Sequence, residues 1–279
     1  MQNVVRALVF DKQVSLTLID GTQMVAEGIR RHKLARVSAE IFGKALCAMT
    51  FASACLKMEK GEISLSAQTA VCGDVGISGN QKLFMRGYIQ NTALGEETSE
   101  RSAFSGGALT IIRDDGYNRP FVGSCAIPEN GGVDGAFEEY YRISEQLPTR
   151  IKTAVVFGEN GALEFAGAIV LQPLPFADKK TLEKTENVDL EVLLNVVQTA
   201  GIESALERLE GGRYATSAHT ARYQCNCSRE RLLGVLASVG EKELRKIIEE
   251  DGAVQVHCHY CNTDYTFTNE DADALFAKE

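Results

Sequence analysis

Four cysteines near the C-terminal end of the chain have the spacing that is typical of metal ligands. Cys225 and Cys227 form one close pair, and Cys258 and Cys261 form a second pair after thirty intervening residues. Zinc binds four thiolate sulfurs tetrahedrally at about 2.3 Å, and a tight turn within each pair presents two sulfurs to the same ion. The pattern therefore predicts a site for one Zn²⁺ with four cysteine ligands in the reduced protein.

The segment that carries these cysteines, residues 223–279, is too short to bury enough apolar surface for comfortable stability. Structural zinc contributes roughly 10–16 kcal/mol to the folding of small peptide domains at neutral pH. We therefore expect the metal to supply much of the folding free energy of this segment. Spacing alone leaves open whether the site is purely structural or also responds to oxidants, which attack thiolates.

Oxidation of the four thiols has two outcomes that the sequence leaves open. A disulfide within a pair, such as Cys258–Cys261, closes about four residues and contributes only about 2 kcal/mol in the chain-entropy model. It would release zinc and leave the two halves of the segment unlinked. A disulfide from Cys227 to Cys258 closes about 32 residues, contributes about 4 kcal/mol and would hold the fold together.

The other cysteines and the histidines have surroundings that predict structural roles. His257 and His259 flank Cys258 and could replace a thiolate, but the four cysteines already complete a tetrahedron. His32 and His219 are isolated in the sequence. The cysteines expected to be small buried residues without redox chemistry are Cys47, Cys55, Cys72 and Cys125.

Composition limits the classes of partner. The 279 residues are 44% hydrophobic and 24% charged, which is typical of a globular protein with two domains. The net charge of −9 disfavours binding to nucleic acid or anionic membranes, because Lys and Arg dominate such contacts. The N-terminal residues lack a signal-peptide pattern, and the apolar run Ala45–Leu56 is shorter than a membrane span of about 20 residues. We expect a cytoplasmic protein with neither nucleic-acid nor membrane partners.

Residues 1–175 are predicted to form a mixed α/β core with many strands and few helices. Ser38 is the expected N-cap of its longest helix, and Ser78-Gly79-Asn80 is an expected turn. The expected strands are Val4–Ile19, Ile63–Ala70, Leu83–Gln90, Ala108–Arg113, Phe121–Ile127, Thr149–Phe157 and Ala162–Leu171, and the expected helices are Ser38–Met58 and Gly135–Gln146.

Residues 176–222 are predicted to form a helical linker. Pro173 and Pro175 end the preceding strand, because proline lacks a backbone donor. The stretch Leu182–Leu209 carries apolar residues on one face, is interrupted by Gly201 and is closed by Gly211-Gly212. Such helices are marginal alone, since they depend on packing for most of their stability.

Residues 223–279 are predicted to fold around the cysteine pairs. Ser228 is the expected cap of a helix over Arg229–Ala237, and a second helix over Glu241–Glu250 ends at Asp251-Gly252. Strands Val254–His257 and Asp264–Thr268 place Cys258 and Cys261 in a hairpin knuckle, and Asn269 caps a last short helix. The predicted fold class is thus α+β, with a mixed α/β core, a helical linker and a small zinc-binding domain.

Motifs along the whole chain are shared with a known family. They are Arg31-His32, Leu83-Phe-Met-Arg-Gly-Tyr88, Gly107-Ala-Leu109, Ser144-Glu-Gln-Leu-Pro-Thr149, Cys225-x-Cys227-Ser-Arg-Glu-Arg231 and Cys258-x-x-Cys261 with Tyr265 and Phe267 after it. On these motifs the chain resembles the 33-kDa redox-regulated heat-shock chaperones, a family of bacterial holdases.

The resemblance implies an ATP-independent chaperone that is inactive while reduced and zinc-bound. Oxidation would form the disulfides Cys225–Cys227 and Cys258–Cys261, release zinc and destabilise a metastable linker. The activated protein would form a homodimer and protect unfolded client proteins from aggregation under oxidative and heat stress. The family's activity is not enzymatic, so no catalytic residues are expected.

Two other functions fit the cysteines less well. A dithiol oxidoreductase would use Cys258-His-Tyr-Cys261, but such a motif should open a helix whose N-terminus stabilises the thiolate, and here a strand is expected to follow. A zinc ribbon that binds nucleic acid should be basic, whereas residues 223–279 contain 6 Lys and Arg against 11 Asp and Glu. The sequence therefore favours the chaperone.

Overall fold

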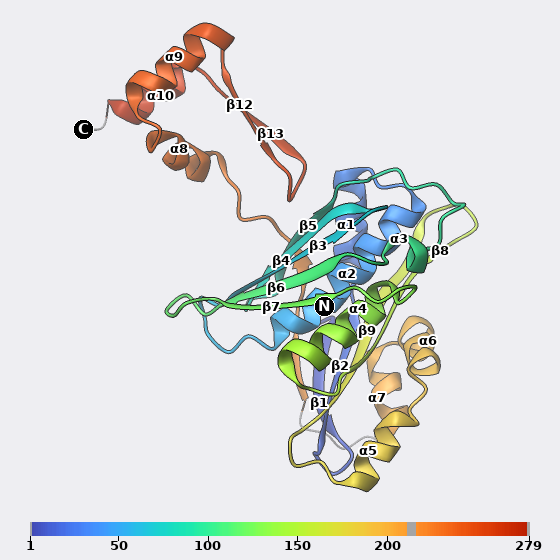
Figure 1. Ribbon diagram of the computed structural model, residues 1–279. Helices are drawn as coiled ribbons and strands as arrows, with labels where there is room; N and C mark the ends of the chain where they lie inside the picture. The colour runs from blue at the N-terminus through green and yellow to red at the C-terminus, as the bar shows by residue number, and fades with distance from the viewer. Residues whose placement is uncertain (1, 211–215, 278–279) are drawn as a thin grey trace. The chain divides into compact units, whose positions relative to one another are not determined.

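The computed structural model describes residues 2–210 and 216–277 (Figure 1). The chain forms two compact units, Met1–Gln224 and Cys225–Glu279. The first unit contains two sheets with helices, and the second contains three helices and a two-stranded hairpin within its described residues, so the predicted α+β class is confirmed. The described part of the predicted linker belongs to the first unit. A separate linker domain at residues 176–222 stays a prediction.

The first unit is built from two sheets. The five-stranded sheet has the order β10-β1-β2-β9-β8 and is antiparallel throughout. Its strands are β1 (Val4–Val9), β2 (Val14–Asp20), β8 (Arg150–Phe157), β9 (Leu163–Pro173) and β10 (Thr216–His219). The six-stranded sheet has the order β11-β5-β4-β3-β6-β7, in which only the β11–β5 pair is parallel. Its strands are β3 (Glu62–Thr69), β4 (Gly73–Asn80), β5 (Phe84–Ile89), β6 (Ala108–Asp114), β7 (Phe121–Ala126) and β11 (Arg222–Tyr223).

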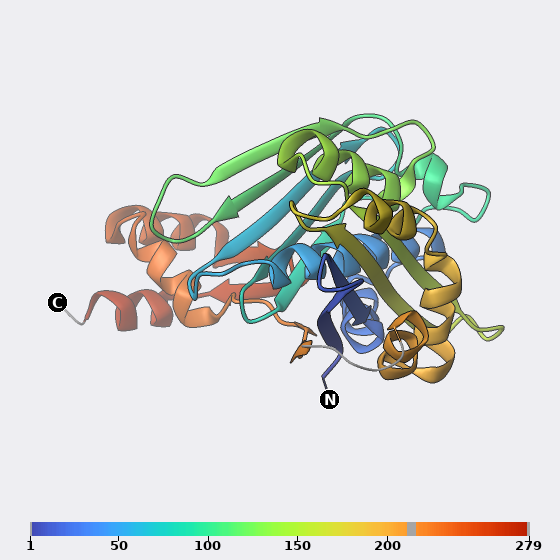
Figure 2. The same cartoon turned by 90° about the horizontal axis from the view of Figure 1, so that it is seen from below.

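Helices α1 (Thr22–His32) and α2 (Arg36–Ala54) fill the space between the two sheets (Figure 2). Helix α2 contacts strands of both sheets and lies in the main core, where its residues 45–49 are fully buried. Gly43 permits this fit, because a Cβ there would lie 2.8 Å from methyl groups of both Val25 and Val155. Small residues thus let the helix sit between two layers of strands.

Helix α4 (Gly132–Tyr140) and the π-turn η1 (Tyr141–Glu145) cover an edge of each sheet. Edge strand β8 donates the Ile151 N–H to Glu138 and the Thr153 N–H to Asp134, at 3.0 and 3.1 Å. The Ser144 hydroxyl donates to the carbonyl of Ser124 on edge strand β7. The unpaired backbone groups of a sheet edge can pair with other chains and cause aggregation. This segment covers two such edges.

Helices α5 (Lys179–Glu186), α6 (Leu190–Ala200) and α7 (Ile202–Glu210) belong to the predicted linker. Figure 1 shows them beside the five-stranded sheet. Leu193, Leu194 and Val197 of α6 are buried in a cluster with strand residues such as Leu16 and Ile169. This cluster is separate from the main core. The predicted apolar face is confirmed, whereas the expected closure at Gly211-Gly212 lies outside the described residues.

The second unit has little apolar interior. Its elements are α8 (Arg229–Ala237), α9 (Glu241–Asp251), β12 (Val254–Cys258), β13 (Thr263–Phe267) and α10 (Asn269–Phe276). Its cluster of buried apolar residues contains Leu244, Ile248 and Ala272. Helix α8 has no fully buried residue, although it carries three leucines and a valine. Apolar burial alone therefore gives this unit little stability.

Some predicted elements are wrong in detail. Strand β4 occupies Gly73–Asn80, where a turn was expected, because its glycines leave room for side chains: a Cβ on Gly76 would lie 2.4 Å from the Tyr88 ring. Helix α1 was not predicted, and Val4–Ile19 is a hairpin of two strands. These differences arise from contacts between elements distant in sequence.

Two predicted helix caps also shift by a few residues. Helix α2 begins after Ala35, and the Ser38 side chain instead donates to the carbonyl of Asn91 at 2.8 Å. Helix α10 begins after Thr268, which forms a capping box with Asp271. The predicted Ser228 cap is confirmed, since its hydroxyl accepts the Arg231 N–H.

The Asp134 contact predicts a pH dependence of stability. Burial raises the pKa of Asp134 from 3.8 to about 6, although Thr153 and Lys44 oppose the shift. The folded protein then binds this proton more tightly than the unfolded chain, so the carboxyl contributes stability as pH falls from about 6 to about 4. Asp134→Asn removes the charge and is expected to raise the free energy of unfolding at pH 7, by up to about 3 kcal/mol for a two-unit shift.

Urea unfolding of both proteins between pH 4.5 and 7.5 measures the effect. The difference in the free energy of unfolding between Asp134→Asn and wild type should shrink toward pH 4.5. A difference that stays constant with pH would contradict the raised pKa of Asp134. Asp115→Asn is a control in which the expected change in stability has the opposite sign. The Asn118 side chain and nearby backbone N–H groups lower the pKa of exposed Asp115, so that variant should lose stability at neutral pH.

Candidate metal centre

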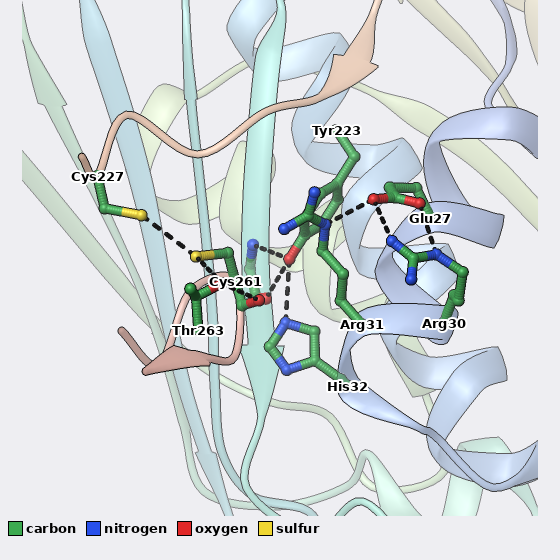
Figure 3. A network of polar contacts seen from close by, with 9 residues as sticks. Glu27, Arg30, Arg31, His32, Tyr223, Cys227, Cys261 and Thr263 are labelled. Carbon is green, nitrogen blue, oxygen red and sulfur yellow. Dashed lines mark hydrogen bonds and ion pairs between the residues drawn. The ribbon is translucent and has the colours of Figure 1, made fainter. Parts of the chain in front are cut away.

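The four predicted cysteines meet at one point in the second unit. Their sulfurs all lie within 4.8 Å of one another, with 3.8 Å between Cys225 and Cys258. The Cys227 and Cys261 sulfurs, drawn in Figure 3, are 3.2 Å apart. Four sulfurs placed tetrahedrally at about 2.3 Å from zinc are about 3.8 Å apart. The donor set and its size therefore fit one zinc ion.

Two local turns present the sulfurs. Cys227 directly precedes Ser228, the N-cap of α8, so the first pair lies where the chain enters that helix. Cys258 ends β12, and its carbonyl accepts the N–H groups of Cys261 and Asn262 at 3.2 and 2.8 Å. Asn262 has a φ of 53°, in the left-handed region that asparagine tolerates in tight turns. The predicted hairpin knuckle is confirmed.

A tyrosine and a threonine extend the polar contacts of the sulfurs. The Tyr265 hydroxyl of β13 lies 3.2 Å from the Cys227 sulfur, and the Thr263 hydroxyl lies 3.3 Å from the Cys261 sulfur. No role for these hydroxyls was predicted from the sequence. The strand alternation after Cys261 could have indicated them, since residues 263 and 265 lie on one side of β13.

The sulfurs differ in their electrostatic surroundings. Burial raises the pKa values of Cys258 and Cys261. Burial also opposes ionisation of Cys227, but contacts with Tyr265 and the other cysteine sulfurs outweigh it and lower the pKa of Cys227 to about 7. The cluster therefore favours a thiolate at one sulfur even before a cation balances the charge.

Arg229 ties the two halves of the second unit together beside the cysteines. Its guanidinium donates to both oxygens of Asp271 at 2.7 Å and to the carbonyl of Thr266 at 2.9 Å. It also lies over the Phe267 ring, 4.7 Å from the centroid. A planar guanidinium suits this combination of a bidentate ion pair and ring stacking. This contact was not predicted from the sequence.

The two histidines near the site lie outside the group of sulfur ligands. His257 Nδ1 is 2.6 Å from a carboxylate oxygen of Asp264, and the His257 and His259 rings meet edge to face at 4.8 Å. Across the described residues, the cluster able to hold a metal ion consists of the four cysteines. The assignment of a cysteine-only ligand set therefore remains the simplest one.

The other four cysteines lie in the first unit. Cys47, Cys72 and Cys125 are buried as predicted, and Cys55 is half-buried. Burial raises the pKa of each thiol, for Cys125 to about 11. Such thiols stay protonated near neutral pH and react slowly with oxidants. His32 is buried against Tyr223, and His219 lies in β10.

Comparisons with known proteins find relatives over nearly the whole chain. A sequence model of the family described as Hsp33 protein matches residues 2–268. Proteins named 33 kDa chaperonin from Bacillus cytotoxicus and Bacillus cereus are 30% identical over 288 aligned positions, covering 98% of this chain and 97% of theirs. The crystal structure of the 33 kDa chaperonin of Thermotoga maritima is similar in fold, with a TM-score of 0.83, 24% identity, and coverage of 99% of this chain and 98% of that chain.

The Arg229 contacts predict a loss of stability in one variant of the second unit. Arg229→Met is expected to cost about 1 kcal/mol, because the ion pair is partly exposed. For a unit this small, that cost lowers the unfolding temperature by roughly 5 °C. The measurement is the temperature at which the zinc-loaded, reduced protein yields zinc to a chelator. Arg231→Met, an exposed change on the same helix, should leave that temperature unchanged; equal shifts in both variants would contradict the role of Arg229.

Proposed function

The chain belongs to the Hsp33 family, and on that premise we propose that it is an ATP-independent chaperone switched on by oxidation of its zinc-binding cysteines. The reduced, zinc-bound protein is inactive. The oxidised protein holds unfolded clients and prevents their aggregation under oxidative and heat stress. The convergence of four cysteine sulfurs in a unit with almost no apolar core is the observation that supports this proposal most strongly.

In the reduced state Cys225, Cys227, Cys258 and Cys261 would hold Zn²⁺ as thiolates. The ion, when bound, would offset part of their negative charge and link the first pair to the second. Oxidation then forms Cys225–Cys227 and Cys258–Cys261. For each pair, the two thiolates would give two electrons to one peroxide molecule, which takes up two protons from solvent and is reduced to two water molecules. The disulfides each close a short loop, so they leave the two halves of the unit unlinked.

Loss of the metal would leave the second unit with few other contacts. Its remaining supports include the cluster of Leu244, Ile248 and Ala272, the buried Phe267 ring, and the partly exposed ion pairs of Arg229 with Asp271 and of Arg245 with Asp273. Partly exposed ion pairs contribute at most about 1 kcal/mol. Such a unit is expected to unfold once its cysteines are oxidised.

The surface offered to clients would come from the linker and the sheet beneath it. Helix α6 covers the outer face of the five-stranded sheet with Leu193, Leu194 and Val197. This cluster is separate from the main core, so α5–α7 can undock from the sheet without exposing α2. Undocking would uncover apolar side chains on both the helix and the sheet, which is the chemistry an unfolded client recognises.

Further properties follow from family membership and charge. We propose that the oxidised protein forms a homodimer and acts in the cytoplasm, with neither nucleic acid nor membrane as a partner. Across the described residues, no helix is both long and apolar enough to span a bilayer. The net charge of −9 disfavours attraction to phosphates.

A dithiol oxidoreductase is the less favoured alternative. Cys258 and Cys261 lie in a turn between β12 and β13, so no helix begins at the pair. The helix N-terminus that activates thiols in such enzymes is therefore missing at this place in the described structure. We propose no enzymatic role, and the absence of insulin disulfide reduction would agree with that view.

A charge in the linker cluster tests the proposal. Leu194→Asp places a carboxylate among buried apolar side chains, which costs several kcal/mol, so α6 is expected to undock in the reduced protein. The variant should suppress aggregation of a heat-unfolded client without oxidant while keeping its zinc. Val192→Asp is the matched control, because Val192 is 43% exposed on the same helix. If Leu194→Asp undocks α6 without holding clients, the proposed client surface is wrong.

A further inference from the structure

The residues that directly precede Cys225 are fixed to the first unit by a dense set of contacts. Ala221 and Tyr223 are 4% and 9% exposed, and they alternate with exposed Arg222 and Gln224 as in a strand. The N–H groups of Arg222 and Gln224 donate to the carbonyl of Leu83, directly before β5, and to that of Met85 on β5, at 3.1 and 2.7 Å. Thus the chain is paired to a sheet edge up to one residue before the first predicted zinc ligand.

Contacts with three other parts of the first unit secure this strand. The Asn3 amide donates to the carbonyl of Ala221 and its oxygen accepts the Ala221 N–H, at 3.1 and 2.8 Å. The Tyr223 hydroxyl donates to the carbonyl of Gly87 and also lies 3.0 Å from His32 Nε2 (Figure 3). Buried polar groups that find such partners are costly to separate.

The tyrosine ring fits a pocket shaped for it. It packs beside the rings of His32 and Phe42, with centroids 6.5 and 6.4 Å away. Gly28 of α1 makes the room, since a Cβ there would lie 2.5 Å from Phe42 and 3.0 Å from Tyr223. Arg31, which pairs with Glu27, lies 5.9 Å from the centre of the Tyr223 ring (Figure 3).

Chain order gives this strand a position between the switch and the linker. From α7 the chain passes through β10, which pairs with β1, then β11, which pairs with β5, and then reaches Cys225. Unfolding that begins in the second unit and spreads along the chain meets Tyr223 before it reaches α6 and α7. The two-residue strand β11 is too short to resist by its ladder alone, so the buried ring and hydroxyl carry much of the restraint.

We infer that Ala221–Gln224, held by Tyr223 against His32 and Gly87, is a latch that stops oxidative unfolding of the second unit from reaching the linker helices. The inference rests on the proposed function and assigns to Tyr223 the restraint that separates the second unit from the linker helices. With the latch closed, oxidation frees zinc and unfolds the second unit while α6 stays docked. Heat or a weakened latch then opens Ala221–Gln224 and undocks α6.

Hydrogen exchange on the full-length protein, oxidised with peroxide at 25 °C, tests the latch. In wild type, amides after Cys225 should exchange rapidly, whereas those of Arg222, Gln224 and α6 should remain protected. Tyr223→Phe loses both hydroxyl contacts, so protection at Arg222 and Gln224 should fall about tenfold and α6 should lose protection at a lower temperature. Tyr117→Phe, whose residue is 64% exposed on the β6–β7 hairpin, should match wild type.

If Tyr223→Phe does not fold, His32→Gln is the second test variant, because it keeps the Tyr223 side chain and removes the imidazole beside its hydroxyl. The inference is overturned if wild-type Arg222 and Gln224 lose protection together with the second unit, or if the Tyr223 and His32 variants exchange as wild type does. Client binding is measured in the same samples. If hydrogen exchange changes as the latch predicts but no sample suppresses client aggregation, the proposed function is refuted and the inference about the latch still holds.

Discussion

The second unit needs a link between its two halves that its own apolar residues do not provide. Cys225 and Cys227 enter the unit before α8, whereas Cys258 and Cys261 lie in the hairpin beyond α9. Between them the buried apolar cluster is small, and α8 has no fully buried residue. Bonds from four sulfurs to one metal ion would supply the missing link, and structural zinc contributes roughly 10–16 kcal/mol in comparable small domains. A unit stabilised in this way is stable only while its thiols are reduced.

The linker helices of the first unit also depend on one set of contacts, though less strongly than the second unit depends on its metal ion. Its main core around α2 is large and closed, with α4 and η1 covering one edge of each sheet. The linker helices instead form a second cluster on the outer face of one sheet. Leu193, Leu194 and Val197 are buried only while α6 stays docked, so this part of the fold can open without loss of the rest. Under the proposed function, this arrangement would let the chain expose apolar surface and still keep a folded core.

The sequence was most informative where chemistry depends on local spacing. The two cysteine pairs, the Ser228 cap and the knuckle between Val254 and Thr268 could all be predicted, because each is set by neighbours within a few residues. Contacts across the fold could not. Arg229 reaches Asp271 and Tyr223 reaches His32 over separations in sequence that no periodicity reports.

The missed elements have the same cause. Strand β4 is rich in glycine and has the composition of a turn, and only the packing of Tyr88 and Met85 onto Gly76 and Gly79 explains its glycines. The N-cap of α2 moved because Ser38 finds a tertiary partner in Asn91. Tertiary contacts overrode local preference at these positions.

The most direct test of the central claim follows zinc and activity in one sample. Zinc release is recorded with a chromogenic chelator during peroxide treatment at elevated temperature, while suppression of a model client's aggregation is measured in parallel. The account predicts that holdase activity appears as zinc leaves and that reductant with added zinc reverses both. Zinc that stays bound while activity appears, or zinc that leaves without any activity, would contradict it.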